Sequence, residues 1–219
     1  TFDSYYCICR EGYSIINDAV NTCGLTSADC NSAMDLVFVA DGSGSICDHE
    51  DVTGCPNWDS VLNFMRNHVI DLNIGPEADR VAVIIFAGDA TVEIGLADYS
   101  DKAELMDAIL NIPYIPKKRT NAADGIQKMI LEYADNPREG AAQISVYISD
   151  GISNVNAEMT LPYAENAKDS GVTIFAVGVT DEIDEEKLRL ISSPPQREGE
   201  SYFLSPTFET LEEISAVVS

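Results

Sequence analysis

The chain has 219 residues, enough for one large domain and a small one, and its formal net charge is −24. Such an acidic surface repels phosphate backbones and anionic membranes, which argues against binding of nucleic acids or lipid headgroups. It favours divalent cations and cationic partners, unless the charge serves solubility alone. The apolar runs are as long as strands, and none approaches the roughly 18–20 residues of a membrane span. Thr1 begins no signal peptide, so we expect a mature protein or a fragment.

The six cysteines are concentrated near the amino terminus, with four in the first 30 residues. That segment is too short for a hydrophobic core of its own, so its cysteine density indicates disulfides and an oxidising, extracellular compartment. Zinc binding is the alternative. However, the cysteines form no paired C-x₂-C motifs, and His49 and His68 lack ligand-like spacing. We therefore expect disulfides.

The character of the sequence changes near residues 31–33. Residues 1–33 are polar and cysteine-rich, whereas residues 34–219 alternate apolar strands with helical patterns. Strands are predicted at 34–40, 80–86, 90–94, 143–149, 172–178 and 202–204, the third being a short edge strand. Helices are predicted at 57–70, 101–110, 121–133, 157–170, 184–191 and 208–218. This alternation predicts a doubly wound α/β domain with a largely parallel sheet, helices on both faces and ligands beyond the carboxyl ends of the strands.

Oxygen-bearing side chains follow two of the predicted strands. Asp41, Ser43 and Ser45 follow the first strand, and Asp150 follows the strand at 143–149. Thr120 lies just before a predicted helix. Carboxylates and hydroxyls are hard donors that suit Mg²⁺, Mn²⁺ or Ca²⁺, and five donors leave an octahedral position open to an outside carboxylate. Alternatively, the serines cap a helix and Asp150 caps a turn, which does not explain why all of them meet at one sheet edge.

The pattern Asp41-x-Ser43-x-Ser45, followed by Thr120 and Asp150, resembles the metal-ion-dependent adhesion site of von Willebrand factor A (VWA) domains and integrin inserted domains. The resemblance covers about residues 34–219. It implies a six-stranded, mostly parallel sheet with one antiparallel edge strand. It also implies that the two serines and the threonine bind Mg²⁺, or else Ca²⁺ or Mn²⁺, directly, and that the aspartates bind it directly or through water.

Two segments beside this site depart from the usual family pattern. In the first, Cys47 and Cys55 are close enough to form a disulfide around a small acidic loop. The acids of this loop are Asp48, Glu50 and Asp51. They would shape the choice of ligand or hold a second, weaker cation, or else they are simply solvated.

The second departure is the run Lys117-Lys118-Arg119, directly before Thr120, where related domains often have glycines. These cations would attract an acidic ligand to the rim of the metal site. The alternative is an ordinary exposed run of charge.

The first 23 residues resemble the carboxyl-terminal half of an EGF-like module, with a C-x-C motif, a Gly-Tyr pair and a last cysteine. The resemblance implies a disulfide between Cys9 and Cys23. Cys7 then pairs with Cys30, or both have partners outside this chain. A generic disulfide-linked arm is the alternative.

EGF-like and VWA modules in tandem resemble matrilin-type extracellular matrix proteins. This implies a secreted adhesion or assembly module whose metal accepts a carboxylate from a matrix or cell-surface partner, and it also implies self-association into filaments. The alternative is a structural scaffold whose metal site binds no ligand. No enzymatic activity is expected. The chain has no G-x-S-x-G, G-x-x-x-x-G-K-[ST] or H-E-x-x-H motif, and only the acids of the 47–55 loop resemble a general base.

Overall fold

The structure is a computed structural model that describes residues 33–47, 54–211 and 214. The predicted EGF-like segment, the pairing of its cysteines and the acids of the 47–55 loop lie outside the described residues. The domain boundary predicted after residue 33 separates the VWA-like part from that segment, so it stays a prediction as well.

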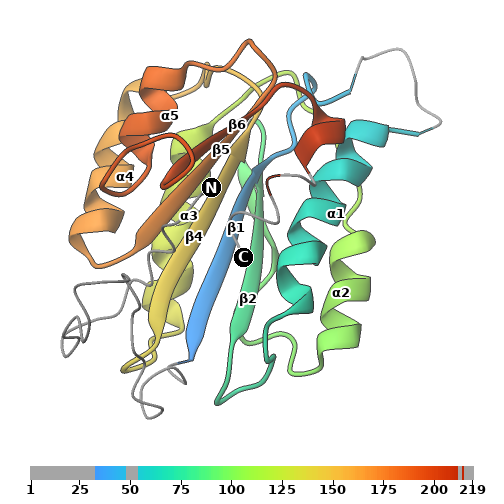
Figure 1. Ribbon diagram of the computed structural model, residues 1–219, viewed down its shortest axis with the longest axis vertical. Helices are drawn as coiled ribbons and strands as arrows, with labels where there is room; N and C mark the ends of the chain where they lie inside the picture. Colours follow the sequence, from blue (N-terminus) through green and yellow to red (C-terminus); the bar gives the residue numbers. More distant parts are fainter. Residues whose placement is uncertain (1–32, 48–53, 212–213, 215–219) are drawn as a thin grey trace, which may run out of the picture. The chain divides into compact units, whose positions relative to one another are not determined.

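A six-stranded sheet forms the centre of the described part (Figure 1). Its strands are β1 (Met34–Asp41), β2 (Arg80–Phe86), β3 (Ala90–Ile94), β4 (Ala142–Ser149), β5 (Thr173–Val179) and β6 (Tyr202–Ser205). They lie in the order β3-β2-β1-β4-β5-β6, and only the β2–β3 pair is antiparallel. The expected mostly parallel sheet with one antiparallel edge strand is confirmed.

Helices cover both faces of this sheet (Figure 1). One face packs against α1 (Pro56–Ile70) and α2 (Lys102–Leu110). The other packs against α3 (Ala122–Asp135), α4 (Thr160–Asp169) and α5 (Glu185–Ile191). In the part of the chain that the structure describes, no helix has both the length and the apolar composition needed to cross a membrane.

The apolar run of β1 explains why the sheet is covered on both sides. Side chains alternate between the faces of a strand, so Leu36 and Phe38 pack towards α1 and α2, whereas Val37 and Val39 pack towards α3 and α4. All four are buried. A strand with no polar position in this run can be accommodated only between two layers of helices.

The helix predicted at 157–170 differs in its first turn. Residues Ala157–Met159 form the 3₁₀ turn η1, and α4 begins at Thr160. Pro162 is tolerated there because the N–H groups of a first helical turn have no partner within the helix. The helix predicted at 208–218 begins as the 3₁₀ turn η2 (Phe208–Thr210), and most of it lies outside the described residues.

A buried ion cluster lies at the amino end of the sheet. Asp35 of β1 accepts two hydrogen bonds from Arg80, at 2.8 Å to Oδ1 and 2.7 Å to Oδ2. Arg138 pairs with the same carboxylate and donates to the Met34 carbonyl at 3.0 Å. The Asp35 side chain is 1% exposed, so its charge is neutralised by two arginines rather than by water.

Candidate metal centre

The carboxyl ends of β1 and β4 lie side by side, because these strands are parallel neighbours that pair Ala40 with Ile148. Asp41 is the last residue of β1, and Asp150 directly follows β4. In the sheet, β2 lies on one side of β1 and β4 lies on the other. Strands that follow one another in the chain are therefore added on opposite sides of β1, and the direction of the strand order changes between β1 and β4. Ligands of open α/β sheets bind at such a switch point.

A series of hydrogen bonds connects the two aspartates through the serines. The backbone N–H of Ser43 donates to Asp41 Oδ1 at 2.8 Å. The hydroxyl oxygens of Ser43 and Ser45 lie 3.0 Å apart, and Ser45 Oγ donates to Asp150 Oδ1 at 3.1 Å. Around an octahedral Mg²⁺ with metal–oxygen distances of about 2.1 Å, adjacent donors are about 3.0 Å apart. The spacing of these oxygens therefore fits such an ion.

Thr120 is fixed between the loops that carry the other predicted ligands. Three residues before Thr120 in the sequence, the Lys117 carbonyl accepts a hydrogen bond from the Gly44 N–H at 2.9 Å. The N–H of Thr120 donates to Asn154 Oδ1 at 3.0 Å, and its carbonyl accepts from Ser153 Oγ at 3.0 Å. Thr120 is buried. The three loops that carry the predicted ligands are therefore hydrogen-bonded to one another.

Local sequence explains how two of these loops hold their conformation. A Cβ on Gly42 would lie 2.6 Å from Cγ2 of Ile85, so only glycine lets the loop approach β2 and donate its N–H to the Phe86 carbonyl at 2.8 Å. Asn121 ends the Thr120 loop, because its side chain accepts from the Asp124 N–H and caps α3.

Both aspartates are weaker acids than usual. Burial, followed by the negative charge of Asp150, raises the pKa of Asp41 to about 7, although hydrogen bonds from Ser43 and Ser149 oppose the shift. Burial also raises the pKa of Asp150. Without a cation, two buried carboxylates disfavour each other's ionised form, and a divalent cation would remove that penalty.

The hydroxyl groups are essential to this donor set. Among the described residues, no three His, Cys, Asp or Glu side chains come together as a metal-binding group. Any ion bound here would be held by carboxylate and hydroxyl oxygens together. A donor set made only of oxygen favours Mg²⁺, Ca²⁺ or Mn²⁺.

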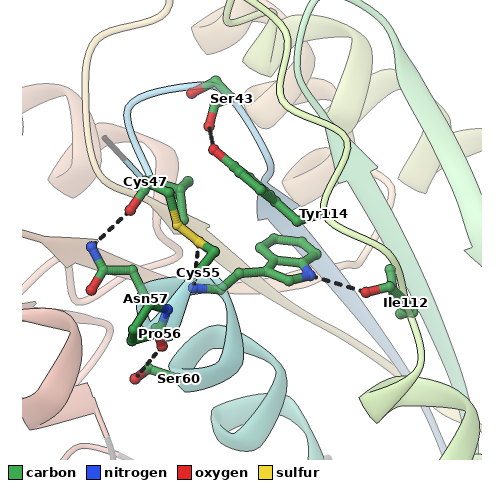
Figure 2. Close-up of a disulfide and its surroundings, with 10 residues drawn as sticks. Ser43, Cys47, Cys55, Pro56, Asn57, Ser60, Ile112 and Tyr114 are labelled. Atoms are coloured by element: carbon green, nitrogen blue, oxygen red, sulfur yellow. Dashed lines mark hydrogen bonds between the residues drawn. A yellow bond between two sulfur atoms is a disulfide. The ribbon is translucent and has the colours of Figure 1, made fainter. Parts of the chain in front are cut away.

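Several supporting residues were not evident from the sequence. Ser149 is the last residue of β4, and its hydroxyl donates to Asp41 Oδ2 at 3.0 Å. Tyr114 donates its hydroxyl to the Ser43 carbonyl at 2.8 Å (Figure 2). Its ring also packs against that of Trp58, at a centroid distance of 5.5 Å. No motif identifies Tyr114, because it is 71 residues away from Ser43 in sequence.

The disulfide predicted between Cys47 and Cys55 is present (Figure 2). The two Cα atoms are 5.8 Å apart, within the usual range for a disulfide. Cys55 is also the N-cap of α1, where its sulfur accepts from the Trp58 N–H at 3.3 Å. The disulfide thus ties the segment after Ser45 to the first turn of α1, in which Trp58 is buried.

The basic run before Thr120 is exposed. Lys117 pairs with Asp89 at 3.2 Å, but both side chains are largely solvated and such a pair contributes little to stability. Lys118 and Arg119 are exposed next to the buried Thr120. Their predicted role at the rim stays a prediction.

Comparisons with known proteins agree with this architecture. The family model of the von Willebrand factor type A domain matches residues 35–217. Matrilin-1 of Gallus gallus is 29% identical over 214 residues, which cover 96% of this chain and 40% of matrilin-1. The collagen alpha-1(XII) chain of Notophthalmus viridescens is 34% identical over 173 residues, which cover 76% of this chain and 17% of the collagen chain.

A solved structure is also similar. Proximal thread matrix protein 1 from the mussel byssus, with a zinc-occupied MIDAS motif, matches with a TM-score of 0.75 and 30% identity, over 87% of this chain and 46% of that one. This chain therefore spans less than half the length of these relatives. The match over residues 35–217, together with the six-stranded sheet, shows that the chain belongs to the von Willebrand factor type A domain family and is matrilin-like.

Proposed function

We propose that this domain binds a divalent cation at the carboxyl edge of its sheet and uses the cation's open position to bind a carboxylate of a partner protein. The residues that would hold the cation are Asp41, Ser43, Ser45, Thr120 and Asp150. The observation that carries the proposal is the row of oxygens from Ser43 through Ser45 to Asp150, in which neighbouring oxygens lie 3.0 and 3.1 Å apart. Asp41 is held beside this row by the 2.8 Å hydrogen bond from the Ser43 N–H. Mg²⁺ is the cation that this spacing and this oxygen-only donor set favour.

The relatives support a secreted module of the extracellular matrix. The mussel relative is named a matrix protein, and its MIDAS motif holds zinc. The other two relatives are a matrilin and a collagen chain. By analogy, the partner is a matrix or cell-surface protein that presents an acidic residue, or a second copy of this chain in a filament.

Binding, rather than catalysis, is the role proposed for these hydroxyls. The hydroxyls of Ser43 and Ser45 are hydrogen-bonded to each other, and that of Ser45 donates to the carboxylate of Asp150, whereas a nucleophilic hydroxyl is activated by an adjacent general base such as histidine. His68, the histidine that the structure describes, belongs to α1 and packs against Phe38 and Phe64 in the core.

A structural scaffold is the alternative function. It is favoured by the fact that the carboxylate of Asp41 already accepts hydrogen bonds from Ser43 and Ser149, so the loop has internal partners without an ion. A scaffold of this kind would fold equally well with and without a divalent cation.

Substitution of Ser45 separates these alternatives. Ser45 is exposed, so Ser45→Ala should change the stability of the metal-free domain by at most about 0.5 kcal/mol. Because the hydroxyl is a proposed ligand, the affinity for Mg²⁺ should fall at least roughly tenfold, equivalent to about 1.4 kcal/mol. Titration calorimetry measures the affinity. Fluorescence provides a second readout, since Trp58, the single tryptophan of the chain, packs on Tyr114 beside the metal loop.

Ser60→Ala is the matched control, because Ser60 lies on α1 and its hydroxyl donates, in an exposed position, to the Pro56 carbonyl of the same helix. It should bind Mg²⁺ like the wild type. If the wild-type domain shows no heat of binding and no thermal shift with Mg²⁺, the metal-dependent function is rejected in favour of the scaffold.

A further inference from the structure

Two exposed isoleucines lie on the loops of the metal centre. Among the described residues, Ile115 and Ile152 are the most exposed large apolar side chains, at 65% and 60%, and the others that are exposed range from 36% to 48%. A single exposed isoleucine needs no explanation. Two of them beside one proposed binding site suggest a contact surface.

Ile152 is held at the rim of the site by its neighbours. It is two residues after Asp150, so their Cα atoms are at most about 7.6 Å apart. The Asp150 carbonyl accepts from Thr180 Oγ1 at 3.2 Å, and the hydroxyl of Ser153 donates to Thr120 at 3.0 Å. The backbone is therefore anchored on both sides of Ile152, while its side chain faces solvent.

Ile115 is anchored in the same way on the loop before Thr120. The preceding residue, Tyr114, donates to the Ser43 carbonyl at 2.8 Å (Figure 2). Two residues later, the Lys117 carbonyl accepts from the Gly44 N–H at 2.9 Å. Both anchors are on the loop that carries the proposed serine ligands, so Ile115 also lies at the rim of the site.

Charge at the rim is divided between two sides. Lys118 and Arg119 are exposed beside Thr120. On the other side, Thr180 contacts the Asp150 loop and is followed by two exposed acids, Asp181 and Glu182. In a chain with a net charge of −24, an acidic ligand would be repelled by most of the surface and attracted to the basic run.

We propose that the partner is a protein segment in which the metal-binding acidic residue is flanked by aliphatic or aromatic residues that pack on Ile115 and Ile152, with a further acidic residue towards Lys118 and Arg119. This inference rests on the proposed function and specifies the chemistry of its partner. The isoleucines bind by burying apolar surface, and the basic run orients the segment by charge.

The test uses a displayed library of heptapeptides with a fixed central glutamate and three random positions on each side. The library is selected on the immobilised 219-residue chain in Mg²⁺, and bound peptides are eluted with EDTA. We expect the eluted peptides to be enriched in apolar residues within three positions of the glutamate and in a second acid on one side only.

The strongest eluted peptide is then synthesised with a fluorophore and titrated by anisotropy. Ile115→Ser and Ile152→Ser should each weaken its binding roughly tenfold, because each removes the burial of one aliphatic side chain. Mg²⁺ affinity should not change in either variant. Ile70→Ser is the matched control, because Ile70 is 44% exposed at the end of α1, where Lys102 contacts its carbonyl. That variant should bind the peptide like the wild type.

The outcomes distinguish this inference from the function on which it rests. EDTA-eluted peptides without flanking apolar residues, or with affinities unchanged by both isoleucine substitutions, overturn the inference and leave metal-dependent carboxylate binding intact. If Mg²⁺ binds but no peptide is eluted by EDTA, both the inference and the proposed carboxylate binding are overturned.

Discussion

Asp41→Asn is expected to make the metal-free domain more stable at pH 8 and to abolish its stabilisation by Mg²⁺. Asp41 is buried, and its pKa in the folded state is about 7, compared with an ordinary value of 3.8. Because the folded state holds this proton more tightly than the unfolded state, the contribution of Asp41 to stability falls as pH rises from about 4 to 7. A rise of about three pKa units corresponds to about 4 kcal/mol, which is the upper limit of the gain from removing the charge.

The wild-type domain, unlike the variant, should be stabilised by Mg²⁺. At a concentration of 100 times Kd, a ligand that binds only the folded state stabilises it by about 2.7 kcal/mol. For a domain of this size, that corresponds to a rise in Tm of roughly 5–10 °C. The rise should be larger at pH 8 than at pH 5, since the cation favours the ionised carboxylate and must displace a proton at the lower pH.

Thermal unfolding of both proteins at pH 5 and pH 8, with EDTA or Mg²⁺, measures these effects. Asp107→Asn, at an exposed position of α2, is the control and should behave like the wild type. An Asp41→Asn variant that is less stable than the wild type in EDTA at pH 8 would show that the hydrogen bonds of the carboxylate outweigh the penalty of its burial.

Asp35→Asn should produce the largest loss of stability without affecting the metal site. The substitution leaves Arg80 and Arg138 facing a neutral amide in a buried position. Removing one partner of a buried ion pair costs about 3–5 kcal/mol. Asp35 and Asp41 are six residues apart on β1, so about 20 Å separates this cluster from the metal site. The Kd for Mg²⁺ should therefore be unchanged in the molecules that remain folded.

Urea denaturation gives the loss of stability, and calorimetry gives the Kd. Glu186→Gln is the control, because it breaks a solvated pair with Arg189 and should leave the stability close to that of the wild type. Wild-type stability in the Asp35→Asn variant would argue against a structural role for the cluster. A weakened Kd in a fully folded variant would argue that the two ends of β1 are coupled.

The sequence predicts the fold well because its strongest signals are local. The apolar run of β1 and the short alternating pattern of β3 each identify a strand within their own residues. Because Asp41 and Asp150 each follow a predicted parallel strand, the strand pattern predicts that they lie at one edge of the sheet, and parallel pairing of β1 with β4 brings them there. The first turn of α4 was misjudged because the 3₁₀ turn at Ala157–Met159 continues the same helical spacing.

Contacts between residues that are far apart in the sequence could not be predicted from sequence patterns. Asp35 meets Arg80 and Arg138 across 45 and 103 residues, and Ser149 meets Asp41 across 108. The residues next to each of these polar side chains in the sequence do not indicate that it is buried or which residue it contacts. Its burial and its partner depend on how the strands pair. The same holds for Ile115 and Ile152. Their exposure beside the site depends on hydrogen bonds that hold the adjacent residues, Tyr114 and Ser153, to other loops.

Cation binding by the five proposed ligand residues can be tested most directly by a crystal structure of the domain grown in Mn²⁺, with anomalous scattering recorded to locate the ion. We expect one strong anomalous peak at the carboxyl edge of β1 and β4, with the Ser43 and Ser45 hydroxyls within roughly 2.3 Å of the ion. Thr120 should bind it directly, and the two aspartates directly or through water. A well-ordered loop with no peak there, or a peak elsewhere on the acidic surface, would show that these five residues do not form a metal site.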